Sequence, residues 1–206
     1  MRRKTFDLDP ANASLTGFAS NVTGATFTLT ANSSGDGLAH QVSVRNDSAT
    51  DHTGKVITLV GTDENGKAQT DTVNNLSPGA TVETTKYFLT LTSATPSATI
   101  GADTFDIGWV DEVAWPWIPL NWRNPNVTGI IQTDVTGTID YSVWECFQNI
   151  LAGETPIWRV ITALSAKTAD VAASSPSPGA TGLRLVVNSY TDTAEIQMYL
   201  NQPDFY

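Results

Sequence analysis

Few residues of this sequence could carry out catalysis or bind a metal ion. The only histidines are His40 and His52, and the only cysteine is Cys146. A nucleophilic thiol needs a nearby histidine to take its proton, and the sequence shows no sign of such a partner. The two histidines also lack the spacing of zinc ligands. These residues therefore indicate neither thiol chemistry nor a zinc centre.

Each of the three residues has a simpler structural interpretation. His40 falls on the apolar face of a predicted strand over residues 38–45, where we expect a core or rim histidine with satisfied hydrogen bonds. His52 lies in a segment with the composition of a loop, and Cys146 is expected to be a small buried apolar residue in a strand. No Gly-x-Ser-x-Gly, phosphate-binding loop or dinucleotide fingerprint is present. We therefore expect a protein that is not an enzyme and that uses no cofactor.

Acidic residues could instead form an ion site. The segment Gly61-Thr-Asp-Glu-Asn-Gly66 resembles an EF-hand loop only from its third residue, and the match fails because the twelfth ligand position is Thr72. A denser acidic group consists of Asp103, Asp106, Asp111 and Glu112. Asp103 and Asp106 are three residues apart and should face opposite sides of a strand. We therefore favour a solvated sheet edge over a structural ion site and predict no metal ligand.

Tryptophan gives the strongest signal in the sequence. Four of the six tryptophans lie among prolines within residues 109–125, at Trp109, Trp115, Trp117 and Trp122. Their rings could pack a core or domain seam, anchor a protein interface, where Trp is enriched, or stack on sugars. The intervening prolines disfavour regular strands and hence a flat sugar-binding platform. We expect core or seam packing first, a protein interface second and a carbohydrate surface last.

The chain as a whole is acidic and sparsely charged. Its net charge is −10, and charged residues make up 16% of it, below the roughly 25% of an average soluble domain. A nucleic-acid-binding surface needs clustered Lys and Arg and is not expected. The only basic cluster, Arg2-Arg3-Lys4 with the nearby Phe6, could dock on an acidic neighbour, although a solvated chain end is the simpler interpretation. No signal peptide and no apolar run of about 20 residues is visible, so no membrane partner is expected.

The elements that must position these residues are predicted to be strands. Apolar and polar residues alternate with period two over many short segments rich in Thr and Val, which indicates half-buried strands. The step Asn65-Gly66 favours a tight type I′ hairpin. Residues 157–164 fit either a strand or a short helix. The predicted strands span 25–30, 38–45, 55–62, 67–73, 84–92, 104–109, 127–133, 137–147, 183–190 and 194–200.

Strands of this length and spacing predict an all-β fold of two small antiparallel β-sandwich or barrel-like domains with an extended N-terminal arm. We divide the chain into an arm over residues 1–17, a sandwich over 18–112, a Trp- and Pro-rich linker or seam over 113–125, and a second sandwich over 126–206.

Several of these segments resemble small β-sandwich modules of tailed-bacteriophage virion proteins. In the first half they are Gln41-Val-Ser-Val-Arg-Asn-Asp47, the run from Val56 to Lys67, and Glu83-Thr-Thr-Lys-Tyr-Phe88. In the second half, Gly137-Thr-Ile-Asp-Tyr-Ser-Val143, the aromatic segment around Trp158 and Leu183-Arg-Leu-Val-Val-Asn-Ser-Tyr190 are similar to another phage module. These are turn-and-strand patterns and bring no catalytic residues with them.

The resemblance implies an accessory, non-enzymatic structural protein of the virion, which is assembled in the cytoplasm of a bacterial host. We expect it to dock on the capsid surface as a decoration, or cement, protein; a neck or tail component and a host-glycan-binding module of a tail fibre are the alternatives. Its partners would be the major capsid protein or neck and tail proteins, with copies of itself in a symmetric particle. The arm and the segment Trp109–Trp122 are the expected docking elements.

Overall fold

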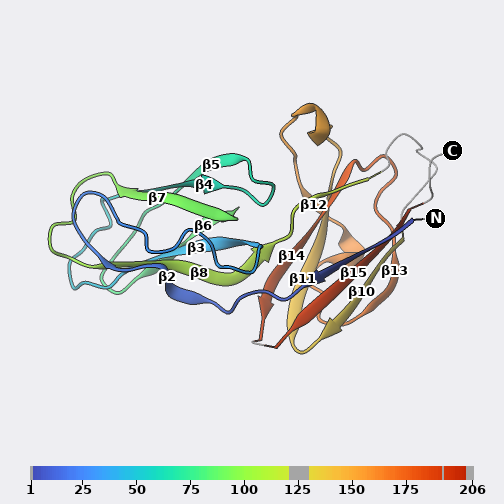
Figure 1. Cartoon of the computed structure of the whole chain (residues 1–206), viewed down its shortest axis with the longest axis horizontal. Coiled ribbons are helices and arrows are strands. Elements are labelled where there is room, and N and C mark those ends of the chain that lie inside the picture. The colour runs from blue at the N-terminus through green and yellow to red at the C-terminus, as the bar shows by residue number, and fades with distance from the viewer. Residues whose placement is uncertain (1, 121–129, 192, 203–206) are drawn as a thin grey trace. The chain divides into compact units, whose positions relative to one another are not determined.

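The structure is a computed structural model that describes residues 2–120, 130–191 and 193–202, apart from the side chains of residues 2–4, 6 and 202. The chain forms two compact units (Figure 1). We call Ala11–Ala114 the continuous unit, and Met1–Pro10 together with Trp115–Tyr206 the split unit. The part of the chain that is described contains no helix with the length and apolar character needed to cross a bilayer.

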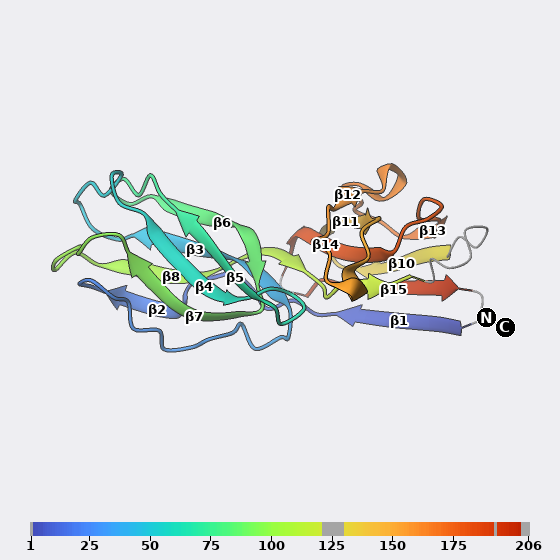
Figure 2. The same ribbon diagram turned by 90° about the horizontal axis from the view of Figure 1, so that it is seen from above.

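The continuous unit consists of two antiparallel layers (Figures 1 and 2). In one layer the strands are adjacent in the order β2 (Ser14–Val22), β8 (Phe105–Ala114), β3 (Ala39–Asn46) and β6 (Thr81–Phe88). In the other layer the order is β5 (Ala68–Val73), β4 (Ile57–Thr62) and β7 (Thr90–Pro96).

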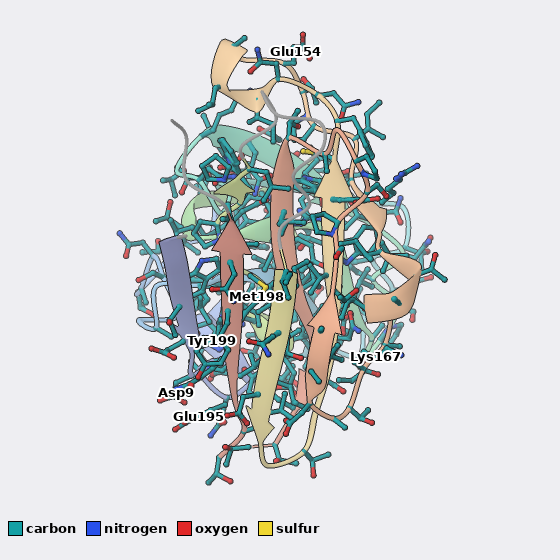
Figure 3. All side chains as sticks on the ribbon, turned by 90° about the vertical axis from the view of Figure 1, so that its right-hand side faces the viewer. Asp9, Glu154, Lys167, Glu195, Met198 and Tyr199 are labelled. Carbon is teal, nitrogen blue, oxygen red and sulfur yellow. The ribbon has the colours of Figure 1, made fainter. Side chains whose placement is uncertain are left out.

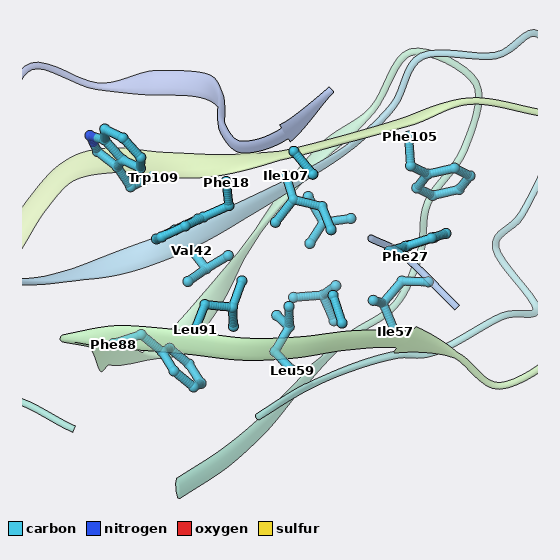
Figure 4. Packing of buried hydrophobic residues seen from close by; sticks show 14 of the residues in the cluster. Phe18, Phe27, Val42, Ile57, Leu59, Phe88, Leu91, Phe105, Ile107 and Trp109 are labelled. Carbon is cyan, nitrogen blue, oxygen red and sulfur yellow. The ribbon is translucent and has the colours of Figure 1, made fainter. Parts of the chain in front are cut away.

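Apolar side chains fill the space between these two layers. Phe18, Val42 and Ile107 come from β2, β3 and β8, and they face Leu59 of β4 and Leu91 of β7 (Figure 4). Each of these five side chains is at most 1% exposed. Burial of one such side chain contributes roughly 1.5–3 kcal/mol, so this core supplies the main stabilisation of the unit.

The split unit is a second sandwich. One sheet has the order β1 (Arg2–Leu8), β15 (Glu195–Gln202), β10 (Ile130–Thr136) and β13 (Val171–Ser174). The other has the order β12 (Arg159–Val160), β11 (Ile139–Cys146) and β14 (Gly182–Tyr190), and the two-residue β9 (Ile118–Pro119) also pairs with β14. Two short 3-10 helices, η1 (Ile150–Ala152) and η2 (Thr162–Leu164), lie in the connections.

The core of the split unit comes from alternate residues of its longer strands. Buried side chains recur at every second position of β14 and β15, as period-two strands require. On β14 these are Leu183, Leu185 and Val187, and Val186 on the other face is buried as well; on β15 they are Ile196, Met198 and Leu200.

The all-β class is confirmed, but the arm predicted over residues 1–17 is wrong for the residues described. Arg2–Leu8 forms β1 and pairs with β15 along its whole length, while Ser14–Val22 forms β2 of the continuous unit. The predicted sandwich over 18–112 and the seam over 113–125 also differ from the observed division, because β8 runs on to Ala114. The polar N-terminal sequence does not indicate that it pairs with β15, a strand almost 200 residues away.

Two strand predictions are wrong, and one segment that the sequence left open contains both of its alternatives. The segment 25–30 forms only a bridge from Phe27 to Ala94, not a strand. The predicted strand 84–92 is two strands, β6 and β7, which belong to different sheets and meet at Leu89. Residues 157–164 contain both alternatives, the short strand β12 and the helix η2.

The hairpin between β4 and β5 forms where predicted but with another turn. Gly66 has φ 77°, whereas Asn65 is not among the residues with positive φ. The amide of Gly66 donates to the carbonyl of Asp63, and the amide of Asp63 donates to the carbonyl of Lys67. A type I′ turn needs positive φ at both central residues, so the predicted type is wrong. The side chain of Asp63 explains the difference, because it accepts from the amides of Asn65 and Lys67.

Candidate functional site

The connection between β11 and β12 carries the most exposed apolar side chains of the described chain. Leu151 is 73% exposed, Ile157 71% and Phe147 38%. We call residues 147–158 the apolar loop. Figure 1 shows it extending beyond the strand ends of the split unit, with η1 in it, and Figure 3 shows Glu154 at its outer end. Exposed apolar side chains on one projecting loop make it a candidate site for contact with another molecule.

Hydrogen bonds from side chains to the backbone hold the apolar loop in one conformation. The side chain of Asn149 accepts from the amide of Ala152, and Gly153 closes η1 in a left-handed conformation at φ 86°. Glu154 accepts from the amide of Asn149 at 2.8 Å, and Gln148 accepts from the amide of Ile157 at 2.8 Å. Because the loop is already ordered, Leu151 and Ile157 would lose little conformational freedom on binding.

The base of the loop is fixed by a buried carboxylate. Glu145 is 2% exposed and accepts from the Nε of Arg159 at 3.1 Å and from both the amide and the hydroxyl of Ser177 at 2.7 Å. The guanidinium of Arg159 also lies 4.4 Å from the ring centre of Phe147. Arg159 therefore contacts both the buried carboxylate and the exposed ring.

A second aromatic group lies around Arg184 of β14. Its guanidinium lies 4.9 Å from the ring centre of Trp158 and 6.0 Å from that of Trp144, within the range of cation–π attraction for both. Trp144 lies directly across from Arg184 in the strand register, and both tryptophans are partly exposed. The indole nitrogen of Trp144 is buried without a hydrogen-bond partner among the described residues.

Of the predicted docking tryptophans, Trp109 belongs to the core. It is 9% exposed and meets Phe18 edge to face, with ring centres 5.1 Å apart. Its indole nitrogen donates to the carbonyl of Asn12 at 2.9 Å. A Cβ atom at Gly17 would come within 2.0 Å of its ring, so the indole fills a slot that only glycine leaves open. Trp109 therefore packs the continuous unit, as the first of the three sequence interpretations expects.

Trp115 and Trp117 lie in the split unit and are half-buried. The amide of Trp115 donates to the carbonyl of Leu185 at 3.0 Å, and the ring of Trp117 lies beside Gly182. These contacts hold the segment against β14. Trp122 lies outside the described residues.

The basic cluster Arg2, Arg3 and Lys4 and the neighbouring Phe6 lie in β1, opposite Gln202, Asn201, Leu200 and Met198 of β15. Their side chains lie outside the described part of the structure. The backbone of the cluster is therefore a sheet edge, and the candidate tryptophans belong to two different units.

Both histidines are buried and paired with carboxylates. His40 is 1% exposed, and its two ring nitrogens lie 2.7 Å from Asp36 Oδ2 and 3.0 Å from the carbonyl oxygen of Val110. His52 is 3% exposed and lies 3.0 Å from Asp103. The interpretation of His40 as a core histidine is confirmed. His52 was expected in a loop, and its burial was not predicted.

The remaining candidates for chemistry serve the fold. Burial raises the pKa of the Cys146 thiol, which is 0% exposed. Asp106 accepts from the amide of Asn21, and Asp111 from the amide of Ala13. Within the described ranges, no group of three or more His, Cys, Asp or Glu side chains is arranged to hold a metal ion.

No protein-family model and no curated protein sequence matches this chain. The apolar loop is therefore the surface feature on which a functional assignment must rest. Sequence reasoning missed it because Leu151 lies outside every predicted strand and Ile157 begins the segment 157–164, which fits either a strand or a short helix. Apolar residues within the Gly- and Pro-containing stretch 150–157 were the available signal.

Proposed function

We propose that this chain is a non-enzymatic structural protein of a tailed-bacteriophage virion that docks on the capsid surface as a decoration protein. The virion setting rests on the resemblance of its strand and turn segments to phage β-sandwich modules. The docking role is supported by one observation, the exposure of Leu151 and Ile157 at 73% and 71% on an ordered loop. The partner would be the major capsid protein, with an apolar depression that accepts these two side chains.

The chemistry of the apolar loop suits a protein partner. Interface energy is concentrated in a few apolar or aromatic anchors that are desolvated on binding. Phe147, with the guanidinium of Arg159 over its ring, belongs to the same loop and would form the rim. Symmetry would repeat the same modest contact many times in one particle, so that a weak single site could give a stably occupied surface.

The proposal is tested first on particles of the phage that encodes the chain. Mass spectrometry of purified particles should find the protein in a fixed ratio to the major capsid protein, and a reconstruction should place its density on the capsid lattice. Density at the neck or tail would support the alternative of a neck or tail component. Absence of the chain from purified particles would contradict every virion role.

The docking surface is tested by substitution. The variants Leu151→Asp and Ile157→Asp should each lose roughly tenfold or more in affinity for particles that lack the protein, since a hot-spot anchor contributes about 2 kcal/mol or more and about 1.4 kcal/mol corresponds to tenfold. Val60→Asp is the matched control, because Val60 is exposed at 36% on β4 of the other unit. Unchanged binding of both loop variants, with normal circular dichroism, would reject the loop as the docking site.

A host-glycan-binding role is the second candidate, and the group around Arg184 is the observation that favours it. Two partly exposed indoles beside one guanidinium could stack on a sugar ring and bind its acidic substituent. A glycan array should then give hits that are lost in Trp158→Ala and kept in Leu151→Asp. An array without hits would eliminate this candidate and leave the capsid proposal untouched.

A further inference from the structure

Strand β1 is separated along the chain from the rest of the unit to which it belongs. All seven of its residues pair with β15, from Arg2 opposite Gln202 to Leu8 opposite Ile196. The whole continuous unit, Ala11–Ala114, lies between β1 and the remainder of the split unit in the sequence. The other strands of the split unit all follow residue 114, so β1 reaches its place by a long-range pairing.

β1 also lies at the edge of its sheet. The order β1-β15-β10-β13 gives it a single neighbouring strand among those described, as Figure 3 shows for β1 beside β15. Of its described side chains only Leu8 is buried, at 2% exposure. An edge strand with one partner is held mainly by its ladder, and withdrawing it exposes a row of unpaired backbone groups on β15. These backbone groups can then form hydrogen bonds with another strand of the same sequence as β1.

The residues that follow β1 are fastened to the continuous unit. The amide of Ala11 donates to Asp36 at 2.8 Å, the carbonyl of Asn12 accepts from Trp109 at 2.9 Å, and the amide of Ala13 donates to Asp111 at 3.1 Å. Only Asp9 and Pro10 lie between the end of β1 and these contacts. Pro10 has a fixed φ, and short, stiff hinges of this kind favour exchange of the element they carry.

A second copy of the chain offers β1 the same partners as its own copy. Every register pair with β15 is remade when β1 is exchanged, so the two arrangements differ mainly in the hinge and in the entropy of association. The charge distribution also favours the encounter. β1 contains three of the eleven basic residues of the chain and one of its 21 acidic residues, so it is attracted to the acidic remainder of another copy.

From these observations we infer that β1 of one copy pairs with β15 of a second copy in place of its own. The partner is another molecule of this chain, and the interface is the β1–β15 ladder in the register Asp7 opposite Gln197. This inference does not depend on the virion role, because it concerns association of the purified protein.

Mixed single-cysteine variants test the exchange in the full chain. Asp7→Cys in one isotope-labelled copy and Gln197→Cys in an unlabelled copy are refolded together and oxidised. Residues directly opposite in antiparallel strands have Cα atoms about 4.5–5.5 Å apart, which suits a disulfide. The native Cys146 is buried and does not compete. We expect a disulfide between labelled and unlabelled copies, detected by mass spectrometry.

The control uses the same strand in the wrong register. Asp7→Cys mixed with Asn201→Cys places the thiols four residues, roughly 13 Å, out of line. Its hybrid yield should be at least about tenfold lower than that of the matched pair, because a disulfide does not form over this separation. Equal yields would indicate random collision and overturn the inference. So would a matched pair that never forms a hybrid while the double variant Asp7→Cys/Gln197→Cys closes within single chains.

A hinge variant gives a second, independent measurement. Three glycines inserted between Pro10 and Ala11 relax the connection and should lower the dimer fraction measured by light scattering. An unchanged or larger dimer fraction would contradict the role of the short hinge. Failure of every cysteine pair to cross-link would refute the β1–β15 ladder itself, and with it the exchange.

Discussion

The carboxylate of Asp36 organises the polar interior of the continuous unit. Its two oxygens accept from His40, from the hydroxyl of Ser34 and from the amides of Ala11 and Leu38, at 2.6–3.0 Å. Burial raises the pKa of Asp36, but these four hydrogen bonds outweigh burial and hold the pKa well below its ordinary value. One side chain thus ties the start of the unit to the turn before β3.

Asp36→Asn should destabilise the continuous unit in a pH-dependent manner. The amide replaces one acceptor oxygen with a donor, so at neutral pH we expect a loss of about 2–3 kcal/mol from unpaired buried groups. Because the folded pKa of Asp36 is depressed, its contribution is complete above the ordinary Asp pKa near 4 and is lost as the pH falls further. Urea unfolding at pH 7 and at pH 2.5 measures this difference.

The difference in free energy of unfolding between wild type and Asp36→Asn should therefore be smaller at pH 2.5 than at pH 7. Asp51→Asn is a suitable control, since Asp51 is exposed and accepts a local hydrogen bond from the amide of Thr53, two residues further on, so its substitution should change stability little at either pH. A gap of the same size at both pH values would show that the carboxylate charge is not the stabilising feature.

At the scale of elements, the pairing of β2 with β8 depends on close approach. The ring of Trp109 on β8 occupies the space over Gly17 on β2, where an added Cβ would lie 2.0 Å from it. The clash involves a ring that is itself packed against Phe18 and hydrogen bonded to Asn12. The ring cannot move aside without breaking both contacts.

Gly17→Ala should consequently destabilise the continuous unit by roughly 1–3 kcal/mol, the usual cost of overpacking a core. The fluorescence of Trp109 should shift to the red in the variant if the ring is displaced toward water. Gly54→Ala is the matched control, because a Cβ there meets no atom within 4 Å. Thermal unfolding followed by fluorescence distinguishes the two, and equal melting temperatures would contradict the proposed clash.

The strands themselves were largely predictable from alternation, and the errors have physical causes. β3, β4, β5, β11, β14 and β15 form close to the predicted ranges because each keeps period two against a core. β2 was missed because its register with β8 shifts twice, which breaks the alternation. Thr84–Thr92 looked like one strand because the step from β6 to β7 at Leu89 leaves the pattern intact. The local sequence does not determine which sheet a strand joins.

The candidate site was predictable only in part. Tryptophan type and spacing singled out Trp109, but its role as a core residue depends on Gly17 and Asn12, which are about 90–100 residues away in the sequence. The apolar loop escaped notice because exposure cannot be read from residue type. Leu151 and Ile157 would fit a core equally well by composition.

At the scale of the whole molecule, the chain passes between the two units twice, at Pro10–Ala11 and at Ala114–Trp115. One unit is continuous in sequence and has its own core, with Val42, Leu59 and Ile107 all fully buried. The other contains a strand contributed from the far side of an insertion of 104 residues, Ala11–Ala114. Folding units usually coincide with compact units. A fragment of the continuous unit should therefore fold on its own, whereas a fragment of the split unit without β1 should be less stable.

A fragment of residues 11–114 should fold alone, whereas a fragment of residues 115–206 should gain stability when a peptide of residues 1–10 is added. The peptide restores seven ladder pairs on β15 and the burial of Leu8, which is 2% exposed in the whole chain. At 100 times its dissociation constant the peptide should stabilise the fragment by about 2.7 kcal/mol. Thermal unfolding followed by circular dichroism measures this gain, with a scrambled peptide of the same composition as the control. Equal effects of the two peptides would mean that β1 adds charge to the split unit rather than a specific strand.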